Sequence, residues 1–174
     1  NPGSLVSTEE TIHVLFKEPG LQSVNLYNTF KDSVAFRGYK KSFDDNDDND
    51  YYVMPSVKVG DKWVIDTTFI VDVYDTIVPK ILIRQNGEVV SHENDSDVIS
   101  IEAGDNLEFV DITTQGRPNT RQWNIAGTTK SDSVSTIVFK KLGDWTGIFN
   151  SSRTGQNIPA GYAKYDIPAT FRVI

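Results

Sequence analysis

The chain contains no cysteine and only two histidines, His13 and His92, in 174 residues. Without cysteine there are no disulfides, thiolate metal sites or cysteine nucleophiles. Two histidines are too few for the usual zinc site, which takes three or four nitrogen or sulfur ligands. His13 lies in an apolar segment, where burial is expected, and His92 lies in a polar loop, where exposure is expected. Neither histidine is predicted to serve a catalytic triad.

Long apolar runs and an excess of positive charge are also absent. No stretch approaches the roughly 20 apolar residues that a membrane-spanning helix needs. The chain has 24 acidic and 17 basic residues, a net charge of −7. A nucleic-acid-binding protein needs a cationic surface, and an anionic membrane surface would repel this chain. The composition therefore predicts no membrane span and no nucleic-acid partner.

Alternating apolar residues are the main structural signal in the sequence. Residues 63–73 form the longest such stretch, with Trp63, Ile65 and Phe69 on one face, because strand side chains repeat every two residues. No helical spacing is sustained, and Gly, Pro, Asn and Asp clusters separate the short runs, as is typical of β-sandwiches. Asn86-Gly87 predicts a hairpin turn. Further strands are predicted at 11–16, 24–26, 81–83, 98–101, 107–112, 122–125, 135–139, 145–149 and 169–174.

An internal repeat indicates two units. Residues 14–20 parallel 137–143, and residues 68–71 parallel 170–173, but the first copy lacks leading strands and carries a longer connection. A partial sandwich exposes strand edges, which invite pairing with another segment or chain. The prediction is two tandem immunoglobulin-like β-sandwiches, the first of them partial or irregular. Their expected bounds are 5–75 with an acidic insertion at 37–60, a short linker at 76–79, and 80–174.

The second unit carries a recognisable set of motifs. Phe109, Asp111 and Thr113 are followed by a Gly-x-Pro segment at 116–118, then by Trp123 and Ile125. A late Gly-Asp-Trp turn at 143–145 and Asn150 complete the set. Together these motifs resemble the PKD domain over about 79–174. Where that family commonly has Gly-Asp-Gly after the tryptophan strand, this chain has Ala-Gly-Thr at 126–128, so a role tied to that aspartate is not carried over.

The resemblance carries functional implications. Two such units with an elaborated loop are similar to surface lipoproteins of glycan-harvesting Bacteroidetes. That similarity implies an extracellular protein on the outer-membrane surface, anchored by a lipid upstream of residue 1. It implies polysaccharide binding in glycan uptake. The alternative is a structural spacer or protein–protein interaction module with no ligand of its own, so the expected partner is a polysaccharide or a neighbouring surface protein.

An acidic run in the first unit is the most unusual segment. Asp44, Asn46, Asp48 and Asp50 place oxygen ligands at alternate positions, as suits Ca²⁺. The run lacks the glycine turn and the terminal glutamate of an EF-hand loop, so a solvated loop is the alternative. Apart from calcium, no cofactor is expected.

Aromatic residues near this run are candidates for stacking against sugar rings. They are Tyr39, Tyr51, Tyr52 and Trp63. Their alternative role is structural, because tyrosine and tryptophan are common in strands and cores. Trp123 and Trp145 are expected in the core.

Catalysis is not expected. The 24 acidic residues leave a glycosidase-type carboxylate pair open. Slim sandwiches with short loops, however, offer little wall for a deep cleft. The sequence thus favours a non-catalytic binding protein.

Overall fold

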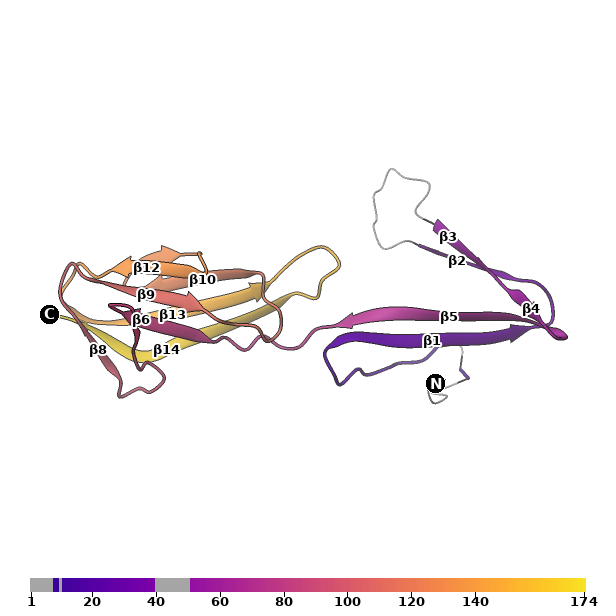
Figure 1. Cartoon of the computed structure of the whole chain (residues 1–174), viewed down its shortest axis with the longest axis horizontal. Coiled ribbons are helices and arrows are strands. Elements are labelled where there is room, and N and C mark those ends of the chain that lie inside the picture. The colour runs from indigo at the N-terminus through magenta and orange to yellow at the C-terminus, as the bar shows by residue number, and fades with distance from the viewer. Residues whose placement is uncertain (1–7, 10, 40–50) are drawn as a thin grey trace. The chain divides into compact units, whose positions relative to one another are not determined.

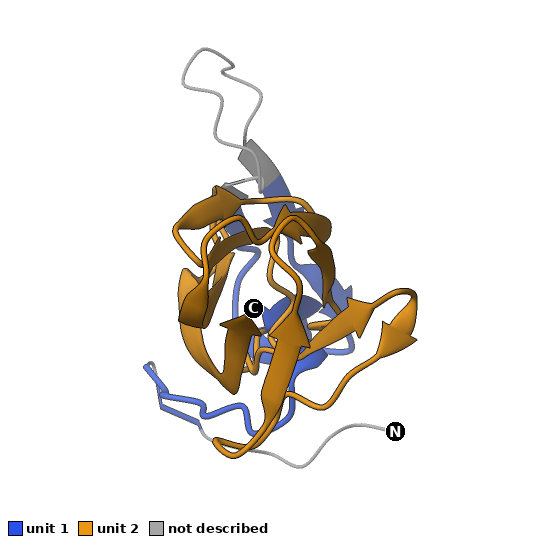
Figure 2. Ribbon diagram, turned by 90° about the vertical axis from the view of Figure 1, so that its left-hand side faces the viewer, with its two compact units in different colours: residues 1–73 blue, residues 74–174 orange. Residues whose placement is uncertain are grey.

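The computed structural model describes residues 8–9, 11–39 and 51–174, with the side chains of 38, 39, 51 and 52 outside that description. All regular structure in these residues is β, which confirms the predicted all-β class. No helix in the described segments is long and apolar enough to cross a membrane. The chain forms two compact units, Asn1–Val73 and Tyr74–Ile174, coloured separately in Figure 2.

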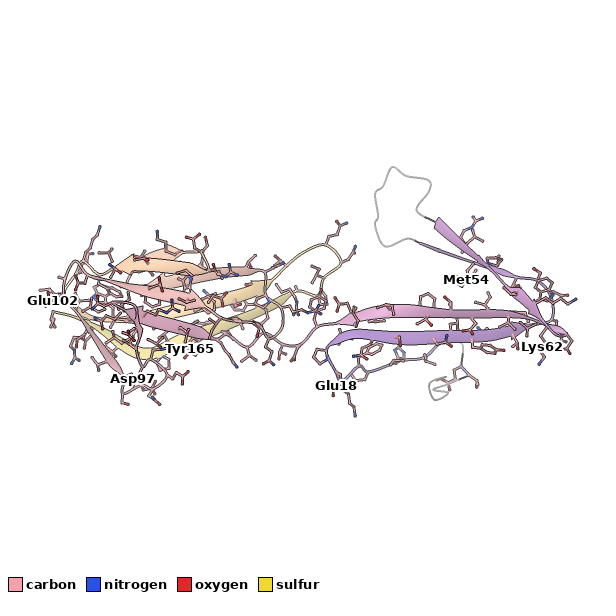
Figure 3. All side chains as sticks on the ribbon, viewed as in Figure 1. Glu18, Met54, Lys62, Asp97, Glu102 and Tyr165 are labelled. Atoms are coloured by element: carbon pink, nitrogen blue, oxygen red, sulfur yellow. The ribbon has the colours of Figure 1, made fainter. Side chains whose placement is uncertain are left out.

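The first unit is built around one long antiparallel ladder. β1 (Gly20–Phe30) pairs with β5 (Lys62–Val73) along its whole length, and β4 (Val57–Val59) pairs with the start of β5 (Figure 1). Glu18 and Lys62, labelled in Figure 3, lie at opposite ends of this ladder. A separate hairpin consists of β2 (Ala35–Tyr39) and β3 (Tyr51–Pro55). Ser56 joins the hairpin to the loop before it, because its Oγ accepts a bond from the Val34 amide at 2.9 Å.

The first unit encloses little apolar material. Among its described residues, the only buried apolar side chains are Val64 and Ile65. Leu21 and Ile70 are 75% and 62% exposed although they lie in the main ladder. A sheet of this kind is stable only when a second layer covers its apolar face. The described part of this unit therefore has only a very small apolar core.

The second unit has two sheets. The five-stranded sheet has the order β11-β10-β13-β14-β8, and the four-stranded sheet has the order β12-β9-β6-β7. All neighbours are antiparallel except β14 and β8, which are parallel. The strands are β6 (Ile81–Gln85), β7 (Glu88–Val89), β8 (Val98–Ile101), β9 (Asn106–Asp111), β10 (Thr120–Ile125), β11 (Thr128–Lys130), β12 (Val134–Val138), β13 (Gly143–Arg153) and β14 (Gly161–Val173).

The core of the second unit lies between these sheets. Seen end-on in Figure 2, the strands surround a central space, which fifteen buried apolar side chains fill. Trp123 is fully buried there, as predicted, with its ring centroid 4.1 Å from that of Phe149 and 5.7 Å from that of Phe109. Trp145, also expected in the core, is only partly buried and packs against the edge of this cluster.

Most of the predicted strands are present. The Asn86-Gly87 turn joins β6 to β7 with φ values of 52° and 86°, as a type I′ hairpin requires. Residues 11–16 are the exception. They form no strand, and Ile12 and Val14 are exposed. Alternation alone does not make a strand when no neighbouring strand accepts its backbone bonds.

Both histidine predictions are wrong. His13 is exposed, because the segment around it packs against nothing that buries it. His92 is only 4% exposed, and its Nδ1 lies 3.0 Å from the carbonyl oxygen of Val90. That bond to the chain two residues earlier turns the ring inward, although the loop around it is polar.

Replacing Ser151 by alanine is expected to keep or raise stability. Ser151 is fully buried, and its hydroxyl has no hydrogen-bond partner in the structure. An unpaired buried hydroxyl carries an uncompensated desolvation cost, so its removal should raise the free energy of unfolding by up to about 1 kcal/mol. Ser135→Ala is the matched control, because Ser135 Oγ donates to the Asp132 carbonyl at 3.2 Å. Denaturant unfolding should show the control losing about 1 kcal/mol; equal losses in both variants would contradict the assignment.

Candidate binding face

The outward side of the five-stranded sheet carries an unusual set of polar side chains. On β10, β13 and β14 every second residue points into the core, so the alternate residues point to solvent. The side chains on this outward side are mostly amides and hydroxyls. In the three rows nearest Tyr162 they are Thr120, Gln122, Asn124, Ile148, Asn150, Ser152, Tyr162, Lys164 and Asp166.

The strand register places these side chains in rows across the sheet. Gln122, Asn150 and Lys164 form one row, since Asn150 pairs with Gln122 on β10 and with Lys164 on β14. The next row towards the Tyr162 end consists of Thr120, Ser152 and Tyr162. Directly opposite side chains in such rows lie about 4.5–5.5 Å apart at Cβ. The rows therefore form one continuous polar face.

Tyr162 is the aromatic residue on this face, and its ring is both exposed and oriented. Its side chain is 66% exposed. Its hydroxyl donates to Asn150 Oδ1 at 2.8 Å, a diagonal contact from β14 to β13. The bond fixes the phenol against the sheet and leaves much of the side chain open to solvent. A pre-oriented ring loses less conformational freedom when a ligand stacks on it.

The amides near the tyrosine are also oriented by their neighbours. Asn124 Nδ2 donates to Gln122 Oε1 at 3.2 Å, and Thr129 Oγ1 donates to Asn124 Oδ1 at 3.0 Å. Within the described part of the chain, Nδ2 of Asn150 and Nε2 of Gln122 make no protein hydrogen bond. Those N–H groups are donors that a ligand can use.

Charge on the face is balanced locally. Lys164 and Asp166 form an ion pair with 2.7 Å between Nζ and Oδ1, and both are exposed. Farther along the same side, Arg172 Nε on β14 lies 2.9 Å from Asp144 Oδ1 on β13, so these two charges are paired as well. A ligand suited to this face is therefore a neutral one with many hydroxyl groups and an apolar side that can cover the tyrosine ring.

The motif that resembles the PKD domain serves the fold of the second unit. Phe109 and Trp123 are fully buried in the core. Asp111 accepts bonds from the Thr113 amide at 2.9 Å and from Arg121 Nε at 2.7 Å, and its side chain is only 4% exposed. These contacts tie the end of β9 to β10. The motif residues contribute packing and ion pairing rather than a ligand site.

The aromatic residues predicted for sugar stacking lie in the first unit. Tyr39 and Tyr51 are register partners at one end of the β2–β3 ladder, and Tyr52 pairs with Gly38 beside them. Their side chains lie outside the described structure. Trp63 is half-buried at the start of β5, opposite Phe30. Trp63 thus shares the partly covered face of the main ladder, and it is not joined to a polar cluster.

The predicted calcium ligands Asp44, Asn46, Asp48 and Asp50 all lie outside the described residues. Among the residues that are described, no three His, Asp or Glu side chains come together as a metal site would require.

Two hollows among the described residues are further candidates for a site. One, of about 200 Å³, lies in the first unit and is mostly apolar, lined by Leu26, Phe30, Val34, Ala35, Phe36 and Ile65 together with Asn28 and Thr67. Asn28 and Thr67 are the only polar residues in this lining, so the hollow offers few groups that would orient a small ligand.

The second hollow, of about 290 Å³, lies beside β8. Asp97 at its rim, labelled in Figure 3, already accepts bonds from the Ser91 hydroxyl at 2.8 Å and the Asn94 amide at 3.1 Å. The bond from Ser91 has the largest effect on the pKa of the Asp97 carboxyl, and both bonds lower this pKa below its ordinary value. Its carboxylate therefore stabilises its own loop, and the outward face of β10, β13 and β14 remains the better candidate.

Comparison with known proteins adds no assignment to this geometry. No protein-family model matches the chain, and no curated protein sequence matches it. The candidate face therefore stands on its own residues and their arrangement.

Proposed function

We propose that the protein is a non-catalytic carbohydrate-binding protein that holds a neutral polysaccharide on the outward face of β10, β13 and β14. The observation that carries the proposal is the exposed Tyr162 ring, fixed by Asn150 among uncharged amides and hydroxyls. Sugar rings offer hydroxyls that exchange hydrogen bonds with amides, and C–H faces that pack on an aromatic ring.

The shape of the face favours an extended ligand. Small-molecule sites are concave and enclose most of their ligand. A sheet surface is open, so a long chain gains contact area along several rows where a single sugar would gain little. The resemblance to PKD domains of glycan-harvesting surface proteins, and the extracellular location it implies, agree with this proposal.

Replacing Tyr162 by alanine is expected to weaken polysaccharide binding about tenfold, because a central exposed aromatic commonly carries a large share of binding energy. Tyr162→Phe keeps the ring and removes the bond to Asn150, so a smaller loss is expected. Val134→Ala is the control, since Val134 is 49% exposed on the outward side of the other sheet. Affinity gels with a panel of neutral polysaccharides, followed by calorimetry, measure these effects.

The same experiment separates the two candidate locations. Tyr51→Ala/Tyr52→Ala tests the first-unit aromatics, and added calcium tests the acidic run. Loss of binding in that variant alone would move the site to the first unit. If the unaltered protein retained no polysaccharide, the proposal of carbohydrate binding would be overturned. The second candidate function, a protein-interaction or spacer module, would then be preferred, as the very small apolar core of the first unit already favours.

A further inference from the structure

Within the described residues of the first unit, the free edge of β1 is the longest unpaired strand edge. β1 lies at one side of the sheet β1-β5-β4, and β5 is its only strand partner within the described residues. All 11 of its residues pair with β5 without a bulge. The opposite side of the same strand therefore carries a continuous row of backbone N–H and C=O groups that make no ladder bond within the described residues.

This edge lacks the usual protection against pairing. Natural edge strands carry charged side chains, prolines or bulges, or they are very short. β1 has no charged residue and no proline over its whole length. The other side of the sheet is better protected, because β4 has only three residues with an exposed lysine, Lys58, at its centre, and the part of β5 beyond β4 carries Asp66 and Asp72. The contrast points to β1 as an interaction edge.

The sequence of β1 is complementary to itself when it is reversed. About Asn25, residues at equal distances on the two sides have matching chemistry over 22–28. An aliphatic pair comes first, then a pair of hydroxyl-bearing residues, then a pair of amides. The pairs are Val24 with Leu26, Ser23 with Tyr27, and Gln22 with Asn28.

We propose that two copies of the chain associate by antiparallel pairing of β1 with β1 about a two-fold axis at Asn25. A two-fold contact uses the same patch on both copies and needs self-complementarity, which the reversed pattern of residues 22–28 supplies. Because the edge is uncharged, the axis brings no like charges together, although each chain has a net charge of −7.

The side chains of β1 fit this arrangement. Asn25 Nδ2 already donates to Asp66 Oδ1 at 2.8 Å and to the Thr67 carbonyl at 3.1 Å on β5 of its own copy. The side-chain amide of Asn25 therefore has hydrogen-bond partners in its own copy and needs none from the second copy when the two strands pair at the axis. Val24 and Leu26 share the face of the ladder that Phe69 and Ile65 occupy, so the pairing extends one apolar face across both copies.

The proposal is independent of carbohydrate binding, and paired charges test its register. In Ser23→Lys/Tyr27→Lys, each introduced lysine faces a lysine of the other copy. In Ser23→Glu/Tyr27→Lys, each faces an opposite charge. Ser23 and Tyr27 are exposed, so neither change disturbs a core. Like charges directly opposite one another destabilise a strand pair and opposite charges support it.

Sedimentation of the full chain is expected to show the average mass rising from one copy towards two between about 1 µM and 1 mM, since a strand-to-strand contact is a small interface. The double-lysine variant should raise the dimer dissociation constant at least about tenfold, and the Glu/Lys variant should restore dimerisation. The proposal would be overturned if the unaltered chain stayed monomeric at every concentration. It would also be overturned if the double-lysine variant dimerised as well as the unaltered chain, or if both variants were equally monomeric.

Amide hydrogen exchange on the unaltered chain gives a second measurement that needs no variant. Alternate amides of β1, those pointing away from β5, should gain protection as the protein concentration rises. Protection of β1 that does not change with concentration would equally overturn the pairing.

Discussion

Replacing Trp123 by alanine is expected to lower the free energy of unfolding of the second unit by about 3–5 kcal/mol. The indole is fully buried between the two sheets and contacts Phe149 and Phe109. Its Nε1 also donates to the Asp132 carbonyl at 2.9 Å. Truncation removes the apolar contacts and this hydrogen bond. It also leaves a cavity, because the two β-sheets cannot move together to fill the space.

Two further variants separate the contributions at Trp123. Trp123→Phe keeps an aromatic ring in the core and leaves Ser135 as a donor to the Asp132 carbonyl, so its loss should be half or less. Trp145→Ala is the matched surface-side control, because Trp145 only borders the core. Urea unfolding followed by circular dichroism measures all three. Equal midpoints for Trp123→Ala and Trp145→Ala would contradict the central position of Trp123.

Strands with strong alternation could be predicted from sequence, and their partners could not. Residues 63–73 form β5 almost to the residue, and Asn86-Gly87 forms the turn between β6 and β7. The alternation at 11–16 is as clear as that of several real strands, yet no strand forms there. A strand exists only where another strand pairs with it, and a local pattern carries no information about that partner.

Short exposed strands were beyond prediction. β2, β3, β4 and β11 have three to five residues each and little alternation, so their sequence resembles that of loops. β4 and β11 form beside longer neighbours, β5 and β10, whereas β2 and β3 pair with each other. Such tertiary effects routinely override local preference.

The candidate face could have been found from the sequence by extending one pattern. The last predicted strand began at residue 169, whereas β14 begins at Gly161. Ala169, Ile167 and Tyr165 share the parity of the core residue Phe171, which places Tyr162 on the opposite, outward side. The bond from Tyr162 to Asn150 joins two different strands, so only the structure could reveal that the ring is oriented.

Replacing Gly116 by alanine is expected to lower the free energy of unfolding of the second unit by about 3 kcal/mol. Gly116 has a φ of +75°, which costs a residue with a side chain about 1–2 kcal/mol. A Cβ at this position would also lie 2.6 Å from Ile77 Cα and 2.6 Å from the Thr76 carbonyl oxygen. Both obstructing atoms belong to the backbone, so no side-chain rotation relieves the overlap.

The chain segment that Gly116 contacts is held by several other bonds. Arg153 is buried, and its guanidinium donates to the carbonyls of Asp75, Gly116 and Pro159. Gln115 Nε2 donates to Asp75 Oδ2 at 3.0 Å. The Tyr74 ring lies under the guanidinium of Arg117 at 3.7 Å and near that of Arg153 at 4.5 Å. Moving residues 76 and 77 away from Gly116 would disturb the contacts of the adjoining Tyr74 and Asp75.

Gly127→Ala isolates the effect of that close approach. Gly127 has nearly the same φ, +77°, but nothing lies within 4 Å of a Cβ built there. This control should therefore lose only the conformational cost, about 1–2 kcal/mol. Denaturant unfolding gives the difference between the two variants, and hydrogen exchange should show faster amide exchange at residues 74–77 in Gly116→Ala alone. If both variants were equally stable and equally protected, the contact of Gly116 with residues 76 and 77 would not hold that segment to the sandwich.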